Sequence, residues 1–381
     1  MDERSPIQNT QSPIQNGLLG DLSAEAFLEE YWQQKPLFLK DALPDFRSPL
    51  APEELAGLAC EDGVTARLIL EEGGARPWEV RHSPFVEEDF LELPETHWTL
   101  LVQEVDRLVP GAARLLDEVA FLPNWRLDDV MVSYAPDRGT VGPHLDSYDV
   151  FLVQGLGRRR WQIGDAPLEG DASYVEGLDV RLLDDFEPDD EFVAEPGDVL
   201  YLPPRVPHYG VALEDCMTYS VGFLAPTPQD LAAGFLEHVA SQTGDGARYR
   251  DAGRSPADPP GLVPEADRAR LRAMLREALD DDAALNRWLG AHLTRPRRGS
   301  NPAPATPYSA EQVRRLLEDG AELHRSTRGD FAFVERDEST VLFAAGTKPL
   351  TTQVLDLGNE HLMKLLAQLL NDGALWIEPT G

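Results

Sequence analysis

The sequence predicts an α+β fold in which a central all-β sandwich or barrel lies between helical segments. Three stretches of different hydrophobic pattern support this prediction: helical spacing before residue 128, short β-rich runs from 128 to 223, and helical spacing again after Pro226. The chain has 381 residues, of which 42% are hydrophobic. It is therefore long enough for two or three domains with a substantial buried core.

The amino-terminal part is predicted to begin with a disordered leader and to continue into helices. Residues 1–20 contain Ser-Pro-Ile-Gln-Asn twice and show no helical or strand period. Ser23 is a suitable N-cap for a helix that places large apolar side chains on adjacent turns, namely Phe27, Leu28, Tyr31 and Trp32. A second helical pattern covers residues 100–118.

The central part is predicted to consist of short strands separated by turns. The β-rich runs are 130–135, 149–153, 158–163, 180–183, 191–194, 199–202 and 217–223. Turn signals separate them, among them Gly155-Leu-Gly157 and Pro196-Gly-Asp198. Many short strands at this spacing indicate an all-β sandwich or barrel.

The carboxyl-terminal part is predicted to hold three helices, a linker and a small α+β unit. The helices are expected at 228–242, 264–279 and 282–292, and the linker at 294–307. The last unit shows a helix, two strands and a helix, an order that resembles a winged-helix module: 309–319, 331–335, 340–343 and 358–371. Residues 301–381 carry 12 acidic and 7 basic side chains, a net charge of −5. DNA binding by this unit is therefore not expected, and docking or dimer support is the better hypothesis.

These patterns divide the chain into five parts. They are a disordered leader (1–20), a β domain (21–226), a helical region (227–293), a linker (294–307) and a winged-helix-like domain (308–381).

Composition limits the classes of function. No apolar run approaches the length of a membrane helix, and the start lacks a signal region, so a cytoplasmic location is expected. Cys60 and Cys216 are far apart and fit reduced thiols. The net charge of −33 disfavours nucleic acid and favours cationic partners. Adaptation to high salt and attraction of a basic protein substrate both explain this charge, and they are compatible.

Three residues in two motifs predict a metal site. His144 and Asp146 in Gly142-Pro-His144-Leu-Asp146 are two positions apart, so an extended chain places both side chains on one face. His208 follows a tight turn, a strand and the rigid segment Pro203-Pro204-Arg-Val-Pro207. Two imidazoles and one carboxylate form a facial triad that binds Fe(II) and leaves coordination positions open for a co-substrate and dioxygen.

Arg159 is the candidate ligand for that co-substrate. Strand alternation places it on one face with Trp161 and Ile163, a mostly apolar face that is expected to point inward. A buried guanidinium needs an anionic partner, and a bound dicarboxylate can provide one through a bidentate pair. Ser133, inward-facing on the strand 130–135, is a candidate for an additional hydrogen bond.

The motifs resemble those of the bacterial ribosomal oxygenases, a Jumonji-C (JmjC) branch of the cupin superfamily. The resemblance rests on Gly142-Pro-His144-Leu-Asp146-Ser-Tyr-Asp-Val-Phe-Leu-Val-Gln154-Gly-Leu-Gly-Arg-Arg159-Arg-Trp161, on Pro196-Gly-Asp-Val-Leu-Tyr-Leu-Pro-Pro204 with Pro207-His208, and on Phe27 to Pro36. It extends over nearly the whole chain after residue 20. One departure is Tyr209, where the family pattern has an acidic residue.

The resemblance implies a double-stranded β-helix core and an Fe(II)- and 2-oxoglutarate-dependent dioxygenase. His144, Asp146 and His208 would bind iron, Arg159 would pair with the distal carboxylate of 2-oxoglutarate, and Ser133 would assist. The implied reaction is hydroxylation of an arginine β-carbon in a large-subunit ribosomal protein. The resemblance also implies a homodimer that forms through the middle helical region.

Three alternatives remain open at this stage. A related oxygenase that hydroxylates histidine in another ribosomal protein would have the same metal site. A non-catalytic cupin sensor joined to a winged-helix regulator would not need a complete open triad and an inward Arg159. A metal-storing or structural cupin would more often close the site with a further ligand.

Overall fold

The computed structural model describes two compact units, residues 1–225 and 226–381. The described residues are 17–242, 248–255, 259, 261–293, 307–319, 322–325, 331–336, 339–344, 350–352, 360–371 and 375–378. The predicted linker lies outside them except for Pro307, and the predicted leader except for residues 17–20. For these four residues the prediction of disorder is wrong, because Leu18 and Leu19 are buried in the main hydrophobic core.

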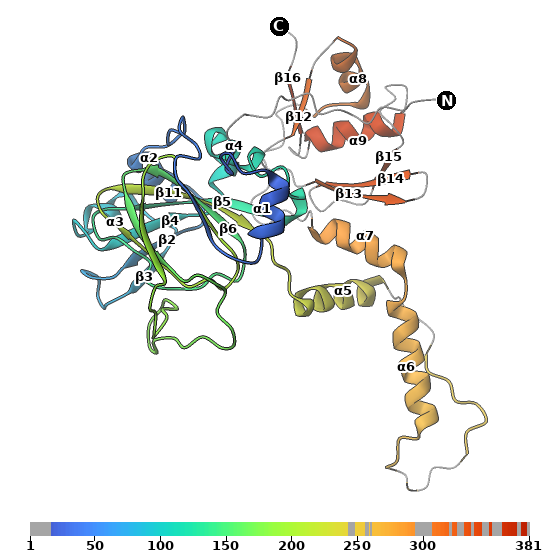
Figure 1. Ribbon diagram of the computed structural model, residues 1–381. Helices are drawn as coiled ribbons and strands as arrows, with labels where there is room; N and C mark the ends of the chain where they lie inside the picture. The colour runs from blue at the N-terminus through green and yellow to red at the C-terminus, as the bar shows by residue number, and fades with distance from the viewer. Residues whose placement is uncertain are drawn as a thin grey trace. The chain divides into compact units, whose positions relative to one another are not determined.

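The first unit is built mainly from β-strands (Figure 1). Its strands are β1 (Leu37–Leu39), β2 (Ala66–Leu70), β3 (Glu79–His82), β4 (Trp98–Val102), β5 (Leu127–Ala135), β6 (Val150–Leu156), β7 (Arg159–Ile163), β8 (Asp190–Ala194), β9 (Val199–Leu202), β10 (His208–Ala212) and β11 (Cys216–Phe223). Its helices are α1 (Ala24–Glu30), α2 (Pro52–Ala59), α3 (Glu87–Leu91) and α4 (Pro110–Asp117), with 3₁₀ turns at Val105–Arg107 and Asn124–Arg126. The predicted N-cap is confirmed, because Ser23 accepts a hydrogen bond from the backbone N–H of Ala26.

The strands form two antiparallel sheets. Eight strands form the large sheet in the order β1-β9-β6-β11-β5-β4-β2-β3, and three form the small sheet in the order β10-β7-β8. Apolar side chains from both sheets pack together, among them Val150 and Leu200 from the large sheet and Trp161 and Ile163 from the small one. The two sheets therefore face each other, as the predicted β sandwich requires.

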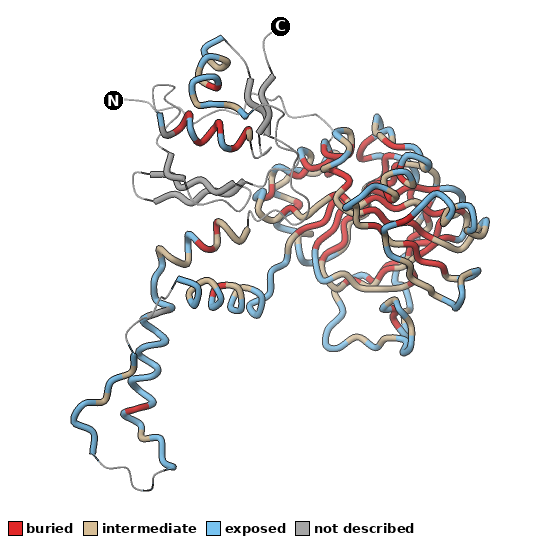
Figure 2. Tube along the Cα trace, turned by 180° about the vertical axis from the view of Figure 1, so that it is seen from behind, coloured by how far each residue is buried: buried red, intermediate tan, exposed pale blue. Residues whose placement is uncertain are grey.

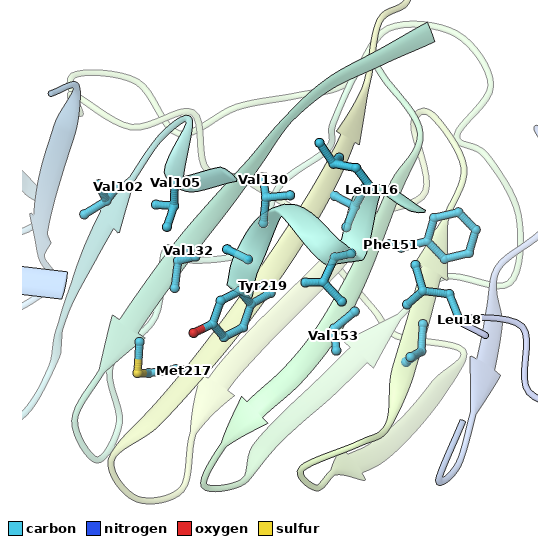
Figure 3. Close-up of a cluster of buried hydrophobic side chains, with 14 of the residues drawn as sticks. Leu18, Val102, Val105, Leu116, Val130, Val132, Phe151, Val153, Met217 and Tyr219 are labelled. Carbon is cyan, nitrogen blue, oxygen red and sulfur yellow. The ribbon is translucent and has the colours of Figure 1, made fainter. Parts of the chain in front are cut away.

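The main hydrophobic core lies on one face of the large sheet, under α1, α2 and α4. Figure 3 shows part of it, with Val130, Val132, Phe151, Val153 and Tyr219 gathered together. The strands β6, β9 and β11 are buried along almost their whole length, and Figure 2 shows the buried centre of the sheet. Because successive side chains of a strand alternate, the opposite face of the same strands points toward the small sheet.

Two predicted elements are wrong. The expected helix over 100–118 is a strand, β4, followed by a 3₁₀ turn and the short helix α4. Glu104 has a left-handed φ of 56°, and Pro110 can only occupy a first helical turn, so no continuous helix crosses these positions. Pairing of β4 with β2 and β5 decides the conformation of its apolar run.

The expected strand at 180–183 is also wrong, because only an isolated bridge joins Leu183 to Tyr174. The segment lies in the long connection between β7 and β8, which is rich in acidic residues and glycine, so a regular partner strand does not form. The other predicted strands are confirmed with ends shifted by no more than a few residues.

The second unit contains the predicted helices. They are α5 (Pro228–Gln242), α6 (Glu265–Leu279), α7 (Asp282–Leu293), α8 (Ala310–Glu318) and α9 (Glu360–Asn371). Its strands are β12 (Glu322–Arg325), β13 (Phe331–Arg336), β14 (Ser339–Ala344), β15 (Leu350–Thr352) and β16 (Leu375–Glu378). Val313 of α8 packs against the apolar face of α9, and Phe235 of α5 contacts Trp288 of α7. Among the described helices, none has the length and apolar character that crossing a membrane requires.

Candidate metal centre and its cavity

The structure brings His144, Asp146 and His208 together. One potential ligand atom from each lies within 4.8 Å of the others, and Nε2 of His208 is 3.6 Å from Oδ2 of Asp146. His144 and His208 are backbone partners, because each N–H donates to the carbonyl of the other at 3.0 and 3.1 Å. This reciprocal pairing joins a segment before β6 to the first residue of β10, and it explains how ligands 64 positions apart meet.

The backbone also sets the tautomer of both histidines. Nδ1 of His144 lies 2.9 Å from the carbonyl oxygen of Gly142, and Nδ1 of His208 lies 3.0 Å from that of Val206. In a neutral ring Nδ1 must carry the proton to donate these bonds, so the lone pair is on Nε2. Both imidazoles therefore offer the same nitrogen, which is the arrangement that outer hydrogen bonds enforce in metal sites.

Tight backbone turns hold the ligands in place. Gly142 has a φ of +78°, and a Cβ there would lie 2.3 Å from Leu182, so only glycine fits this approach. Arg205 has a φ of +68°, and its N–H donates to the carbonyl of Asp146 at 2.7 Å. These contacts connect the two motifs that the sequence presents separately.

Burial keeps His208 neutral. Its side chain is almost fully buried, and desolvation followed by repulsion from His144 lowers the pKa of His208 to about 4, against the opposing effect of Asp146. A histidine must be deprotonated to bind a metal. The imidazole of His208 is already neutral at neutral pH, so it can bind a cation without first releasing a proton.

The ligands face a cavity of about 600 Å³ between the two sheets. The lining includes side chains from the small sheet and from the cavity face of the large sheet, among them Met131, Ser133, Leu152, Trp161, Thr218 and Ser220. Tyr209 is not among the lining residues. As the second residue of β10, it alternates with His208 and points to the other side of the small sheet.

Arg159 lies inside this cavity, as strand alternation predicts. Its side chain is 3% exposed, and Trp161 and Ile163 on the same face are also buried. In the described part of the chain, Nε and Nη2 of Arg159 have no hydrogen-bond partner. An unpaired buried guanidinium is costly, and a bound anion would supply the missing acceptors. The cavity therefore fits an anionic ligand at this end.

Ser133 is buried on the cavity face of β5, also as predicted. Among the residues that the structure describes, its Oγ makes one long contact of 3.5 Å, with the carbonyl of Thr218, which leaves it able to donate elsewhere. Sequence reasoning missed neighbouring residues of the cavity wall, namely Arg67, Asp128, Asp129, Tyr148 and Thr218. The alternation of Thr218 and Ser220 within an otherwise apolar strand was a usable signal for the last of these.

Comparison with known proteins places the chain among oxygenases. It is 39% identical over 300 residues to the ribosomal protein uL16 3-hydroxylase of Escherichia coli strain K12, covering 78% of this chain and 79% of that protein. It is 42% identical over 228 residues to a probable ribosomal oxygenase of Haemophilus influenzae, covering 59% of this chain and 55% of that protein.

Family models and solved structures also place the chain among the oxygenases. Residues 114–231 match a JmjC domain, and residues 277–357 match a ROXA-like winged helix. The crystal structure of YcfD from E. coli superposes with a TM-score of 0.82 at 33% identity, covering 94% of this chain and 99% of that one. A complex of the same ribosomal oxygenase with cobalt and 2-oxoglutarate gives a TM-score of 0.80 at 34% identity, with the same coverage.

Proposed function

Because the chain belongs to the family of JmjC-domain ribosomal oxygenases, we propose that it is an Fe(II)- and 2-oxoglutarate-dependent dioxygenase that hydroxylates a ribosomal protein. The substrate position that we propose is the β-carbon of an arginine in a large-subunit protein. The observation that carries the reaction type is the joint presence, in one cavity, of an open His-Asp-His triad and an unpaired buried arginine.

We assign the metal to His144, Asp146 and His208. These residues would hold iron on one side through two Nε2 atoms and one carboxylate oxygen. The hydrogen bonds from Nδ1 of the two histidines to backbone carbonyls restrict rotation of both rings. The bound iron and 2-oxoglutarate supply the oxidative chemistry, in which dioxygen, 2-oxoglutarate and a substrate C–H group give succinate, carbon dioxide and an alcohol. The protein orients the reactants and excludes water from them.

We assign Arg159 to the distal carboxylate of 2-oxoglutarate. Its unpaired Nε and Nη2 fit a bidentate pair with a carboxylate, and its Cζ lies 5.7 Å from the centroid of the Trp161 ring. Ser133 is placed to donate one more hydrogen bond to the same ligand from β5. In this assignment the two residues on β5 and β7 fix one end of the co-substrate while iron fixes the other.

A cationic substrate residue suits the acidic residues of the cavity wall. Asp128, Asp129 and Asp179 line the cavity, and Asp179 forms an ion pair with Arg76. An arginine gains from such carboxylates, whereas a neutral histidine would gain less, and this favours arginine over the histidine alternative. The net charge of −33 also favours a basic partner, and this is compatible with adaptation to high salt as its main cause.

The test is incubation of the protein with Fe(II), 2-oxoglutarate and purified ribosomal proteins, followed by mass spectrometry. We expect one protein of the large subunit to gain a single oxygen atom, and fragmentation to place it on the β-carbon of an arginine. The His208→Ala variant serves as the inactive control. A gain on histidine would support the alternative substrate, and no gain on any ribosomal protein would exclude both.

We also propose a cytoplasmic homodimer that forms through the helical region 227–293, without direct DNA binding. The support is α6, which is exposed over nearly its whole length (Figure 2) and carries an apolar row of Leu271, Met274, Leu275 and Leu279. Light scattering should show a dimer that Leu275→Glu dissociates. Leu91→Glu, at a more exposed leucine of α3, should leave it intact.

The leader, shortened to 1–16 because Leu18 and Leu19 belong to the core, the JmjC domain (17–226), the linker (294–307) and the winged-helix-like domain (308–381) complete the division that we propose. Limited proteolysis with mass spectrometry of the fragments is expected to cut first within 294–307.

A further inference from the structure

The cavity extends well beyond the residues assigned to iron and 2-oxoglutarate. Past β5 it continues over β4, β2 and β3, where Ile69, Val80 and Leu101 form an apolar floor. These strands lie on the opposite side of β5 from β6 and β9, the strands that pack against the small sheet. This extension, which we call the outer floor, has room for a part of the substrate.

Arg67 lies at the centre of the outer floor. It belongs to β2, where it pairs with His82 of β3 on one side and Leu101 of β4 on the other. Ala66 and Leu68 on either side of it are buried in the main core, so alternation directs Arg67 and Ile69 to the cavity. Arg67 and Tyr148 both line the cavity, so the two side chains face the same space.

The guanidinium of Arg67 is incompletely paired. Its Nε is buried, and in the described part of the chain this atom has no hydrogen-bond partner. Arg159 shows the same deficiency within the same cavity. Arg181, the remaining arginine of the cavity wall, stacks on an aromatic ring: its Cζ lies 4.4 Å from the centroid of the Tyr174 ring. Buried donors are normally satisfied, so Arg67, like Arg159, is prepared for an acceptor that arrives with a ligand.

The reaction suggests which acceptor this is. A β-carbon is bonded directly to the α-carbon, so its approach to the metal draws the substrate main chain into the cavity. Each carbonyl that leaves water there needs a donor. The substrate arginine is itself a cation and cannot pair with Arg67, and this directs its side chain toward the carboxylates of Asp128, Asp129 and Asp179, which also line the cavity.

We propose that Arg67 binds a main-chain carbonyl oxygen of the substrate beside the hydroxylated residue, and so positions the β-carbon. This proposal rests on the proposed function. It assigns to Arg67 the role of a specificity-determining residue that recognises the polypeptide main chain. The carboxylates of Asp128, Asp129 and Asp179 would recognise the arginine side chain.

The test measures binding of a fluorescent peptide that contains the hydroxylated residue and its neighbours to protein loaded with Mn(II) and 2-oxoglutarate. Arg67→Met should raise the Kd by about ten- to a hundred-fold, the loss expected for a hydrogen bond from a charged donor. Arg67→Lys should recover part of it. Arg160→Met is the matched control, because its buried Nε is also unpaired but it lies outside the cavity, and it should leave the Kd unchanged.

Peptides in which single amides are replaced by esters, which are weaker acceptors, identify the carbonyl. One ester should weaken binding to the wild type but not further weaken binding to Arg67→Met. A Kd for Arg67→Met within two-fold of the wild type would overturn the proposal, as would an ester scan with no such position.

Substrate-free consumption of 2-oxoglutarate, measured in parallel, separates this proposal from the proposed function. It should be the same in the wild type and in Arg160→Met, which lies outside the cavity. If the wild type consumes 2-oxoglutarate but binds no ribosomal peptide, the proposed substrate and the role of Arg67 both fail.

Discussion

The two faces of the large sheet belong to the same strands, but one packs into the hydrophobic core and the other lines the cavity. On one face, Val130 and Val132 of β5 and Tyr219 of β11 join the main hydrophobic core. On the other, Ser133 of β5 and Thr218 of β11 line the cavity. Both faces are buried, so burial alone does not distinguish them.

The difference lies in how completely polar groups are paired. The phenol of Tyr219 on the core face lies 2.8 Å from the hydroxyl of Ser48. The cavity face instead keeps a buried donor without a partner at Arg67 of β2, and Arg159 of the small sheet adds two more in the same cavity. Substitutions on the core face should therefore reduce stability, and those on the cavity face should reduce binding and turnover with little loss of stability.

The largest effect is expected for His208→Ala. It removes one of three metal ligands, so turnover should fall by more than the roughly 100-fold that loss of an outer hydrogen bond to a ligand costs. Metal titration by calorimetry measures the loss of metal binding, and 2-oxoglutarate consumption measures the loss of turnover. Unchanged turnover would show that the metal is bound elsewhere.

On the core face, Phe151→Ala should lower the free energy of unfolding by about 3–5 kcal/mol. Phe151 is fully buried and packs against the rings of Phe27, Tyr201 and Phe223. Chemical denaturation gives the loss of stability, and the KM for 2-oxoglutarate of the remaining folded protein should stay near the wild-type value. A large change in that KM with unchanged stability would contradict the division between the faces.

In the cavity, Arg159→Met of the small sheet should raise the KM for 2-oxoglutarate by about ten- to a hundred-fold, because a charged hydrogen bond contributes about 1.5–3 kcal/mol. Without 2-oxoglutarate, the melting temperature should stay the same or rise, since a buried unpaired charge is removed. Arg158→Met, at the neighbouring exposed residue that pairs with Glu214, is the control. A marked loss of stability in Arg159→Met alone would mean that its role is structural.

Asp106 is a polar exception beneath the core face, where its Oδ1 accepts from the N–H of Val130 at 2.9 Å. Burial, with Asp129 adding to it and Arg107 opposing, raises the pKa of Asp106 to about 7. Between about pH 4 and pH 7 the folded state therefore holds a proton that the unfolded state has released. Stability should fall as pH rises through this window, by at most about 1.4 kcal/mol per pH unit from this group.

Asp106→Asn keeps an acceptor for Val130 and removes the titration. Unfolding measured from pH 4 to pH 8 should show a smaller decline in the variant than in the wild type. Parallel curves for the two proteins would mean that the pKa of Asp106 is close to its ordinary value.

The smallest effect is expected for Ser133→Ala. Its hydroxyl makes one long contact within the protein, so its loss should cost about 0.5–1.5 kcal/mol of 2-oxoglutarate binding and little stability. The KM for 2-oxoglutarate and the melting temperature check the two parts. A KM that matches the wild type would remove Ser133 from the binding site.

Local pattern in the sequence was enough to predict the parts of the site that depend on alternation along one strand. The inward faces of Arg159 and Ser133 and the common side of His144 and Asp146 need only the period of two in an extended chain. The helices after Pro226 were predictable for a similar reason, since a helical period repeats over neighbouring residues.

Contacts between distant segments decided the rest. The apolar run at 98–102 fits a helix or a strand, and its pairing with β2 and β5 makes it a strand. The backbone bridge between His144 and His208 and the carbonyls that orient their rings appear only in the folded chain. Whether an arginine such as Arg67 or Arg159 has a hydrogen-bond partner depends on all of its neighbours in space. Alternation along a single strand does not predict those neighbours.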